Sequence, residues 1–311
     1  MQTPKFNPRL TVMTIIVVLI VVVLIGRMGY LQVIKGEYYH QLADGNRMRV
    51  IPSMATRGVI LDRQGVAMVT NRPGFAVSVV TMGKPVPEET ILKLSTILGM
   101  PDEDIRKKLK IPAGPFEPIR IKADVGPDIV THIEEKRADL PGVFIEVQPI
   151  RTYVDNELAA HVFGYVNEIN EEELKAKKAE GYKQGDIIGK FGLERVYDRE
   201  LRGQDGGVRV EVDVTGKPMQ TIGKKDPIPG KNLHLTLDIN IQKAAEEAVD
   251  EQLRYLQSQR GTGNAKAAAV VVMNPNTGEI LAMVSKPSFN PNLFAGGISN
   301  KDWNLLNNNP F

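Results

Sequence analysis

The stretch "GKFGLERVYDRELRGQDG", residues 189–206, contributes most to the interpretation of the fold. Its glycines bracket a segment in which apolar residues recur at helical spacing: Leu193, Val196, Tyr197 and Leu201. The spacing predicts an amphipathic helix with an outer face rich in Arg, Glu and Asp. Gly203 is a suitable residue at which to end it.

A second stretch upstream has a similar composition. In "RGVILDRQG", residues 57–65, charged residues bracket the apolar segment 59–61, and glycines stand at both ends. We interpret it as a strand and a turn in which Asp62 pairs with an arginine across the bend. In both stretches arginine side chains are expected to hold two subdomains together rather than to carry out catalysis.

Strand and helix patterns are interspersed along the rest of the chain, which predicts an α+β fold. Alternating β-branched residues predict strands over 75–82, 142–150 and 207–214. A helix over 88–99 should end at Gly99, and residues 266–285 should form a hairpin.

The longest soluble helix should begin after Asp238, an N-cap residue. Its buried face is expected to be apolar: Ile241, Ala244, Ala245, Ala248, Val249 and Leu256.

The N-terminus holds an uncharged run, "LTVMTIIVVLIVVVLIG", residues 10–26. Extended to residue 33, it is long enough to span a bilayer, which predicts a single-pass anchor over 10–33. Lys5 and Arg9 favour a cytoplasmic tail, residues 1–9, and an exported remainder. The alternative is a cleaved signal peptide, but no small-x-small cleavage site follows the run.

Composition excludes several classes of function. The net charge is only +2, which argues against nucleic-acid binding, and the absence of cysteine excludes thiol chemistry and cysteine-ligated zinc. None of the four histidines stands in a metal-ligand spacing, and neither 185–191 nor 261–266 completes a nucleotide-binding loop. We therefore expect no metal and no cofactor.

Five separated motifs, in order, resemble those of class B penicillin-binding proteins. They are 57–65, "RTYVDNELAAHVFGYV" (151–166), 189–206, 233–249 and 267–292. By this resemblance, a structural or partner-binding role is expected for Arg57, Gly58, Asp62, Arg63, Gly65, Arg151, Tyr153, His161, Gly164, Tyr165, Gly189, Gly192, Leu193, Glu194, Tyr197, Asp198, Leu201 and Gly203. One departure is that Val154, Asp155 and Asn156 replace the Pro and Gly that commonly follow the tyrosine in the family.

The resemblance implies a division into domains. Residues 53–215 would form the dimerisation or pedestal domain, 216–232 a linker, and 233–311 the truncated start of a transpeptidase domain. We expect residues 265–311 to pack poorly. The segment 291–303 looks most like penicillin-binding protein 2, the type that acts in cell elongation.

The family's D,D-transpeptidation requires a Ser-x-x-Lys motif, with Ser-x-Asn and Lys-Thr/Ser-Gly completing the site. No serine of this chain has a lysine three residues later, and no lysine precedes Thr-Gly or Ser-Gly. Ser288-Phe289-Asn290 spells Ser-x-Asn by chance. No catalytic residue is therefore predicted within residues 1–311, although the family binds penicillin.

Two hypotheses remain open. Either the gene continues beyond codon 311 into a transpeptidase, or the chain is a non-catalytic, membrane-anchored interaction module. An unrelated wall scaffold would leave the five motifs unexplained. The resemblance implies a bacterial cytoplasmic-membrane location and a SEDS-family glycan polymerase among several cell-wall partners. Peptidoglycan and β-lactams would be ligands only if the catalytic domain were completed.

Overall fold

The computed structural model describes residues 8–36, 48–81, 85–110, 118–212, 218–259 and 264–308. Outside these ranges lie the first residues of the predicted tail, the residue His40, and residues 216–217 of the predicted linker. The chain divides into two compact units. Residues 1–51 and 208–224 form the first, and residues 52–207 and 225–311 form the second.

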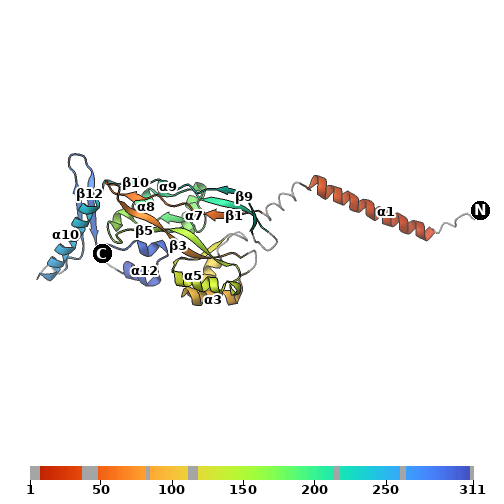
Figure 1. Cartoon of the computed structure of the whole chain (residues 1–311), viewed down its shortest axis with the longest axis horizontal. Helices are drawn as coiled ribbons and strands as arrows, with labels where there is room; N and C mark the ends of the chain where they lie inside the picture. Colours follow the sequence, from red (N-terminus) through yellow and green to blue (C-terminus); the bar gives the residue numbers. More distant parts are fainter. Residues whose placement is uncertain are drawn as a thin grey trace, which may run out of the picture. The chain divides into compact units, whose positions relative to one another are not determined.

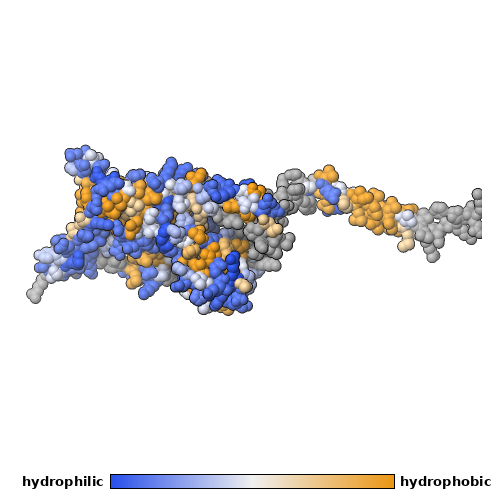
Figure 2. Space-filling model, in the orientation of Figure 1, coloured by the Kyte–Doolittle hydropathy of each residue, from blue (hydrophilic) through white to orange (hydrophobic). Residues whose placement is uncertain are grey.

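The first unit contains the apolar helix α1 (Pro8–Gly29), which continues into the π-helical turn η1 (Tyr30–Ile34). The helical segment Val12–Val33 is long and apolar enough to cross a membrane, and its apolar residues are not buried within the protein. Figure 2 shows α1 as a nearly continuous apolar surface. A three-stranded sheet completes this unit, in the order β1 (Met48–Ser53), β8 (Gly206–Val212), β9 (Pro218–Lys225).

The second unit is built on the long strand β3 (Ala67–Val79). Strand β5 (Val143–Tyr153) pairs with it antiparallel over its whole length, from Val69 opposite Tyr153 to Val79 opposite Val143. The other edge of β3 is shared by β2 (Ile60–Leu61) and β4 (Ile119–Val125). The short β10 (Leu233–His234) pairs parallel with β2, so residues 233–234 extend the same sheet.

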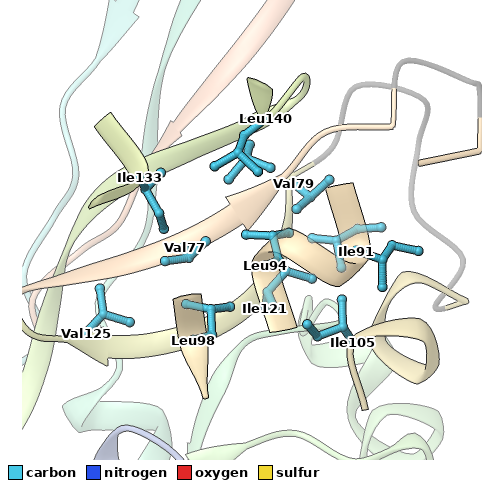
Figure 3. Packing of buried hydrophobic residues seen from close by; sticks show 12 residues of the cluster. Val77, Val79, Ile91, Leu94, Leu98, Ile105, Ile121, Val125, Ile133 and Leu140 are labelled. Atoms are coloured by element: carbon cyan, nitrogen blue, oxygen red, sulfur yellow. The ribbon is translucent and has the colours of Figure 1, made fainter. Parts of the chain in front are cut away.

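Three helices cover one part of this sheet: α3 (Glu88–Leu98), α4 (Asp102–Leu109) and α5 (Pro127–Glu135), the last followed by the 3₁₀ turn η2 (Arg137–Asp139). Figure 3 shows their aliphatic side chains meeting Val77 and Val79 of β3. Helix α3 ends at Gly99 in the left-handed conformation, as predicted. Burial of the branched aliphatic residues of these helices against β3 contributes most of the stability of this part of the sheet.

A series of short elements follows β5 along the chain. They are α6 (Ala160–Phe163), β6 (Val166–Glu168), α7 (Glu171–Lys177), η3 (Lys178–Glu180), β7 (Ile187–Gly189), α8 (Gly192–Val196) and α9 (Asp198–Leu201). Strands β6 and β7 pair antiparallel. Asn170 and Glu173 form a capping box at the start of α7.

The single amphipathic helix predicted after Gly192 is wrong. Tyr197 separates two short helices, and Val196 and Tyr197 are exposed. Leu201 is buried, as the apolar pattern predicts, but the other buried residues are Glu194 and Asp198. Acidic side chains take the inner face because cationic and amide donors are available there, so the hydrophobic pattern misidentified that face.

The C-terminal part contains α10 (Ile239–Ser258), the antiparallel hairpin of β11 (Ala268–Met273) and β12 (Ile280–Lys286), α11 (Asn292–Ala295) and α12 (Asn300–Asn307) (Figure 1). Asp238 caps α10 and the hairpin forms, both as predicted.

Packing is uneven from residue 265 onward. Val271 and Met273 of β11 are exposed, whereas Ala282, Val284 and Phe294 are buried, so the expectation of poor packing is wrong for the latter part.

The predicted buried face of α10 is also wrong in part. Ala244 and Ala248 are exposed, and the buried residues are Gln242, Glu246 and Val249. The Gln242 amide bonds both the N–H and the C=O of Met283, so the helix is fastened to β12 by polar contacts. A buried polar side chain is tolerated where its hydrogen-bonding groups are matched.

Candidate functional site: a buried ionic cluster

The motif residues of three separate stretches meet in one ionic cluster, which we define as Arg57, Arg151, Glu194 and Asp198. Arg57 precedes β2, Arg151 lies on β5, and the two carboxylates lie on α8 and α9. All belong to the second unit. The cluster therefore joins parts of the chain that are up to 141 residues apart.

Glu194 is the centre of the cluster and is fully buried. One carboxylate oxygen accepts from Arg57 Nε at 2.6 Å, and the other accepts from Arg151 Nε at 2.6 Å. Charge-assisted hydrogen bonds of this length are among the stronger polar contacts in proteins. One carboxylate thus holds two guanidinium groups that come from separate stretches of the sequence, before β2 and on β5.

Asp198 receives four donors. Arg57 Nη2 and the Tyr182 hydroxyl each donate at 2.6 Å, the Gly189 N–H donates at 2.9 Å, and Lys177 Nζ lies at 3.5 Å. Burial alone would raise the pKa of Asp198, but the charge of Arg57 and these hydrogen bonds lower it below the usual 3.8. Asp198 is consequently held as an anion and contributes stability above its ordinary pKa, which is lost as the pH falls through the lowered value.

The guanidinium groups also bind the backbone. Arg57 Nη2 donates to the carbonyl of Glu194 at 3.0 Å, and Arg151 Nη1 donates to that of Gly58 at 2.7 Å. Asn71 of β3 completes the set by donating to the Arg57 carbonyl at 2.6 Å. Sequence reasoning missed Asn71, because one asparagine within a strand carries no recognisable pattern.

Asp62 does not pair with an arginine, contrary to the prediction. Its buried carboxylate accepts from the backbone N–H groups of Gln64, Val66 and Ile239 at 2.8, 2.8 and 3.3 Å. It therefore caps the turn through Gly65 and fastens it to the start of α10. Arg63 lies 3.8 Å from Glu279 on the surface. Short aspartate side chains commonly satisfy amides of their own turn.

Several motif glycines are positions where two backbones touch. A Cβ added at Gly189 would lie 1.9 Å from the Glu194 carbonyl oxygen, and one at Gly164 would lie 1.9 Å from that of Phe191. Gly58, Gly192 and Gly203 are similarly close to neighbouring backbone. Glycine at these sites allows α6, β7 and α8 to approach each other, which brings Glu194 under the arginines.

A second group of motif residues contacts the segment after β12. The Asn292 side chain accepts from the Tyr153 N–H and donates to the Tyr153 carbonyl, both at 2.9 Å. His161 Nε2 lies 2.9 Å from the Pro287 carbonyl, and Tyr165 stacks on Phe294 with ring centroids 3.9 Å apart. Leu193 and Leu201 pack in the core beneath, where Leu201 is fully buried.

This arrangement is suited to positioning rather than to bond-breaking chemistry. Both carboxylates of the cluster are engaged by guanidinium and other donors, and no group of metal-ligating side chains is found among the described residues. The Ser288 hydroxyl donates to the carbonyl of Glu157 at 2.7 Å. The serine of the chance Ser-x-Asn sequence therefore makes a structural hydrogen bond.

Comparison with known families decides the identity of the fold. Residues 52–235, well over half of the chain, match the "Penicillin-binding Protein dimerisation domain". The chain belongs to the penicillin-binding proteins. Residues 268–310 match the "Penicillin binding protein transpeptidase domain". The ionic cluster lies entirely within the dimerisation-domain match. Pro287, Asn292 and Phe294, which contact His161, Tyr153 and Tyr165, lie in the transpeptidase match.

Curated relatives support the predicted subtype. The chain is 36% identical to the peptidoglycan D,D-transpeptidase MrdA of Acinetobacter baumannii over 296 residues, covering 94% of this chain and 42% of the relative. It is 31% identical to MrdA of Escherichia coli, covering 93% of this chain and 44% of the relative. The chain therefore spans less than half the length of these relatives.

Solved penicillin-binding proteins have the same fold. A complex between PBP2 and MreC from Helicobacter pylori matches with a TM-score of 0.64 at 25% identity, covering 84% of this chain and 47% of that one. A peptidoglycan synthase complex that coordinates polymerisation and crosslinking matches with a TM-score of 0.56 at 30% identity, covering 97% and 50%. The predicted resemblance to penicillin-binding protein 2 is confirmed.

The buried phenol of Tyr182 predicts a stability change at alkaline pH. Burial, followed by the hydrogen bond to Asp198, raises its pKa from 10.0 to about 12. Because the folded pKa is the higher one, the stabilisation is complete below pH 10 and is lost as the pH rises through about 12. The stability advantage of the unchanged protein over Tyr182→Phe, measured by urea unfolding, should shrink across this interval. Arg202, 3.7 Å above the ring, keeps its contact in the variant. A pH-independent difference would contradict the assignment.

The contact between the dimerisation-domain segment and the transpeptidase segment can be tested at Asn292. Asn292→Ala removes both hydrogen bonds to Tyr153 and should free α11 and α12, at a cost of about 1–2 kcal/mol. Trp303 is the one tryptophan of the chain and packs edge-to-face on Phe294 at 6.5 Å. Its quenching by acrylamide should therefore increase. Asn276→Ala, in the exposed hairpin turn, is the matched control and should leave quenching unchanged.

Proposed function

We propose that this chain supplies the membrane anchor and the dimerisation, or pedestal, domain of a class B penicillin-binding protein that acts in peptidoglycan synthesis during cell elongation. Two observations carry the proposal. The buried ionic cluster fixes separate stretches of the dimerisation-domain match to one another, and the Asn292 side chain attaches the transpeptidase-match segment to Tyr153 of β5, as a rigid support for an enzyme would require. The relatives named peptidoglycan D,D-transpeptidase support the same assignment.

The membrane topology is part of the proposal. Residues 10–33 would form an uncleaved single-pass anchor in the bacterial cytoplasmic membrane, with the tail 1–9 in the cytoplasm and the bulk of the chain outside. The candidate span Val12–Val33 and the basic residues Lys5 and Arg9 support this orientation. The proposal keeps the domain limits predicted from sequence: 53–215 for the pedestal domain, 216–232 for the linker and 233–311 for the start of the transpeptidase domain.

The expected partners are other cell-wall synthesis proteins, including a SEDS-family glycan polymerase. The solved complexes of similar proteins, one with MreC and one a peptidoglycan synthase complex, support partner binding in general. Co-purification of the full chain with the polymerase of the same organism tests it. Glu194→Ala, which disrupts the pedestal, should abolish recovery, while the surface change Glu134→Ala should not. Equal recovery with both variants would refute a role for the pedestal.

The motif residues are proposed to act as positioning residues for this support. Transpeptidation itself is assigned to no residue among 1–311, because the Ser-x-x-Lys motif is missing from them. We expect the purified 311-residue chain to remain unlabelled by a fluorescent penicillin after denaturing electrophoresis. A covalent band that unlabelled penicillin competes away would show that a nucleophile had been overlooked.

The second candidate function is a non-catalytic, membrane-anchored interaction module. The buried contacts of Phe294, Asn292 and His161 favour it, because they give residues 287–303 a packed position within the second unit. Both candidates predict polymerase co-purification. They differ in whether the gene contains an in-frame Ser-x-x-Lys after codon 311, so sequencing past that codon separates them.

A further inference from the structure

Strand β11 has one backbone edge with which no other described strand pairs. The hairpin is a two-stranded sheet, so β11 pairs with β12 alone. The segment "AAAVVVM", residues 267–273, contains no charged residue and no proline, and Val271 and Met273 are 58% and 56% exposed. Charges or proline normally interrupt an edge strand, so this apolar edge is suited to pairing with another strand.

The outer edge of β12, in contrast, is occupied. The Asp238 N–H donates to the Leu281 carbonyl at 2.9 Å, and the Gln242 side chain bonds both the N–H and the C=O of Met283. The irregularity of the hairpin also lies on this strand, because Leu281 is the extra residue there. The open edge of the hairpin is therefore that of β11, which is itself regular.

The register shows which backbone groups of β11 point outward. Val271 lies opposite Met283, whose N–H and C=O point away from β11 toward Gln242. In an antiparallel pair, two residues at such a position both direct their backbone groups away from each other. Val271 and, two positions earlier, Ala269 therefore present their N–H and C=O groups at the open edge.

We propose that this edge pairs antiparallel with the same edge of a second copy of the chain. With the two-fold axis at Val270, four backbone hydrogen bonds join Ala269 and Val271 of the two copies. Each pair on either side of the axis then combines a small residue with a larger one: Ala269 with Val271, Ala268 with Val272, and Ala267 with Met273. The strand is thus complementary to itself, which an unrelated strand would match only in its backbone.

Charge and helix position are compatible with this pairing. Lys266 would lie opposite Asn274 of the second copy, so no like charges face each other. Helix α10 is fastened to β12, and the buried residues of the hairpin, Ala282 and Val284, also lie on β12. The two β12 strands would be about 14 Å apart, three strand spacings, and packed helices need only about 8–10 Å.

The interface would be a four-stranded sheet made of two hairpins. It lies outside the dimerisation-domain match, residues 52–235, and does not depend on the proposed function. An edge contact of this kind buries little surface, so association should be weak and should depend on protein concentration.

Disulfide formation tests the register, because the chain contains no cysteine of its own. The two copies of Val270 would face each other with Cα atoms about 4.5 Å apart, within the range of a disulfide. Val270→Cys, as the full chain in detergent micelles under mild oxidation, should therefore give a reducible band at twice the mass. Ala268→Cys, on the same face of the same strand, is the matched control. Its two copies would be about 13 Å apart and should give at least about tenfold less of this band.

A second experiment removes one outward donor. Val271→Pro lacks an N–H that the hairpin itself does not use, so it should weaken association, measured by light scattering, at least about tenfold. Val271→Thr keeps the N–H and the branched side chain and should associate like the unchanged chain. Introduced into Val270→Cys, the proline should also remove most of the disulfide band, while circular dichroism reports whether the fold is retained.

Three results would overturn the proposal. They are a single-chain mass at every concentration, equal disulfide yields at positions 268 and 270, and unchanged association of a folded Val271→Pro chain. Association with equal yields would assign the contact to another surface of the chain. If Val271→Pro failed to fold, the comparison of positions 268 and 270 would still decide the outcome.

Discussion

Replacing Glu194 by alanine should lower the free energy of unfolding by about 3–5 kcal/mol, because it leaves two guanidinium groups without their buried partner. Arg57 and Arg151 would each lose their bond at 2.6 Å to a fully buried carboxylate. The Arg151 side chain is 2% exposed, so water cannot replace the lost partner. The measurement is denaturant unfolding of the full chain, followed by circular dichroism.

Two further variants make this expectation specific. Glu194→Gln retains the shape and one oxygen, so it should be destabilised less than Glu194→Ala but clearly more than the control. The control is Glu134→Ala, whose pair with Arg137 is solvent-exposed and should contribute little. If Glu194→Ala unfolded at the same denaturant concentration as Glu134→Ala, the cluster would have no role in stability.

Gly164→Ala should destabilise the protein by about 4 kcal/mol or more, through two additive costs. Gly164 has φ +75° and ψ −150°, a region that is essentially restricted to glycine and costs about 1–3 kcal/mol for a residue with a Cβ. The new Cβ would also meet the Phe191 carbonyl oxygen at 1.9 Å and the Gly192 nitrogen at 2.8 Å. Relief of that clash requires α6 and α8 to separate, which moves Glu194 away from the arginines.

Gly181→Ala is the control for a positive φ without a close approach. Gly181 has φ +81° and ψ 19°, the left-handed helical conformation, and no atom lies within 4 Å of an added Cβ. It should lose only the cost of that conformation, about 1–2 kcal/mol. Thermal unfolding of both variants gives, by difference, the combined cost of the close approach and of the ψ −150° conformation at Gly164. Equal losses would mean that the contact between α6 and α8 does not constrain the fold.

The sequence alone was sufficient for the features that local patterns encode. Long apolar runs, strand alternation and cap residues identified α1, the end of α3 at Gly99, the start of α10 after Asp238, and the β11–β12 hairpin. Each depends on interactions between residues close in the chain, so spacing and residue type are enough. The motif order was likewise sufficient for the family.

Tertiary structure decided which polar residues are buried. Glu194 and Asp198 were expected on an outer face, and Asp62 was expected to pair with an arginine. The free energy of burying a carboxylate depends on donors brought from distant segments, here Arg57, Arg151 and backbone amides. A one-dimensional hydrophobic pattern does not contain those donors, because they meet only when β2, β5, α8 and α10 have assembled. Local periodicity therefore determined the elements, and long-range charge matching determined the faces they bury.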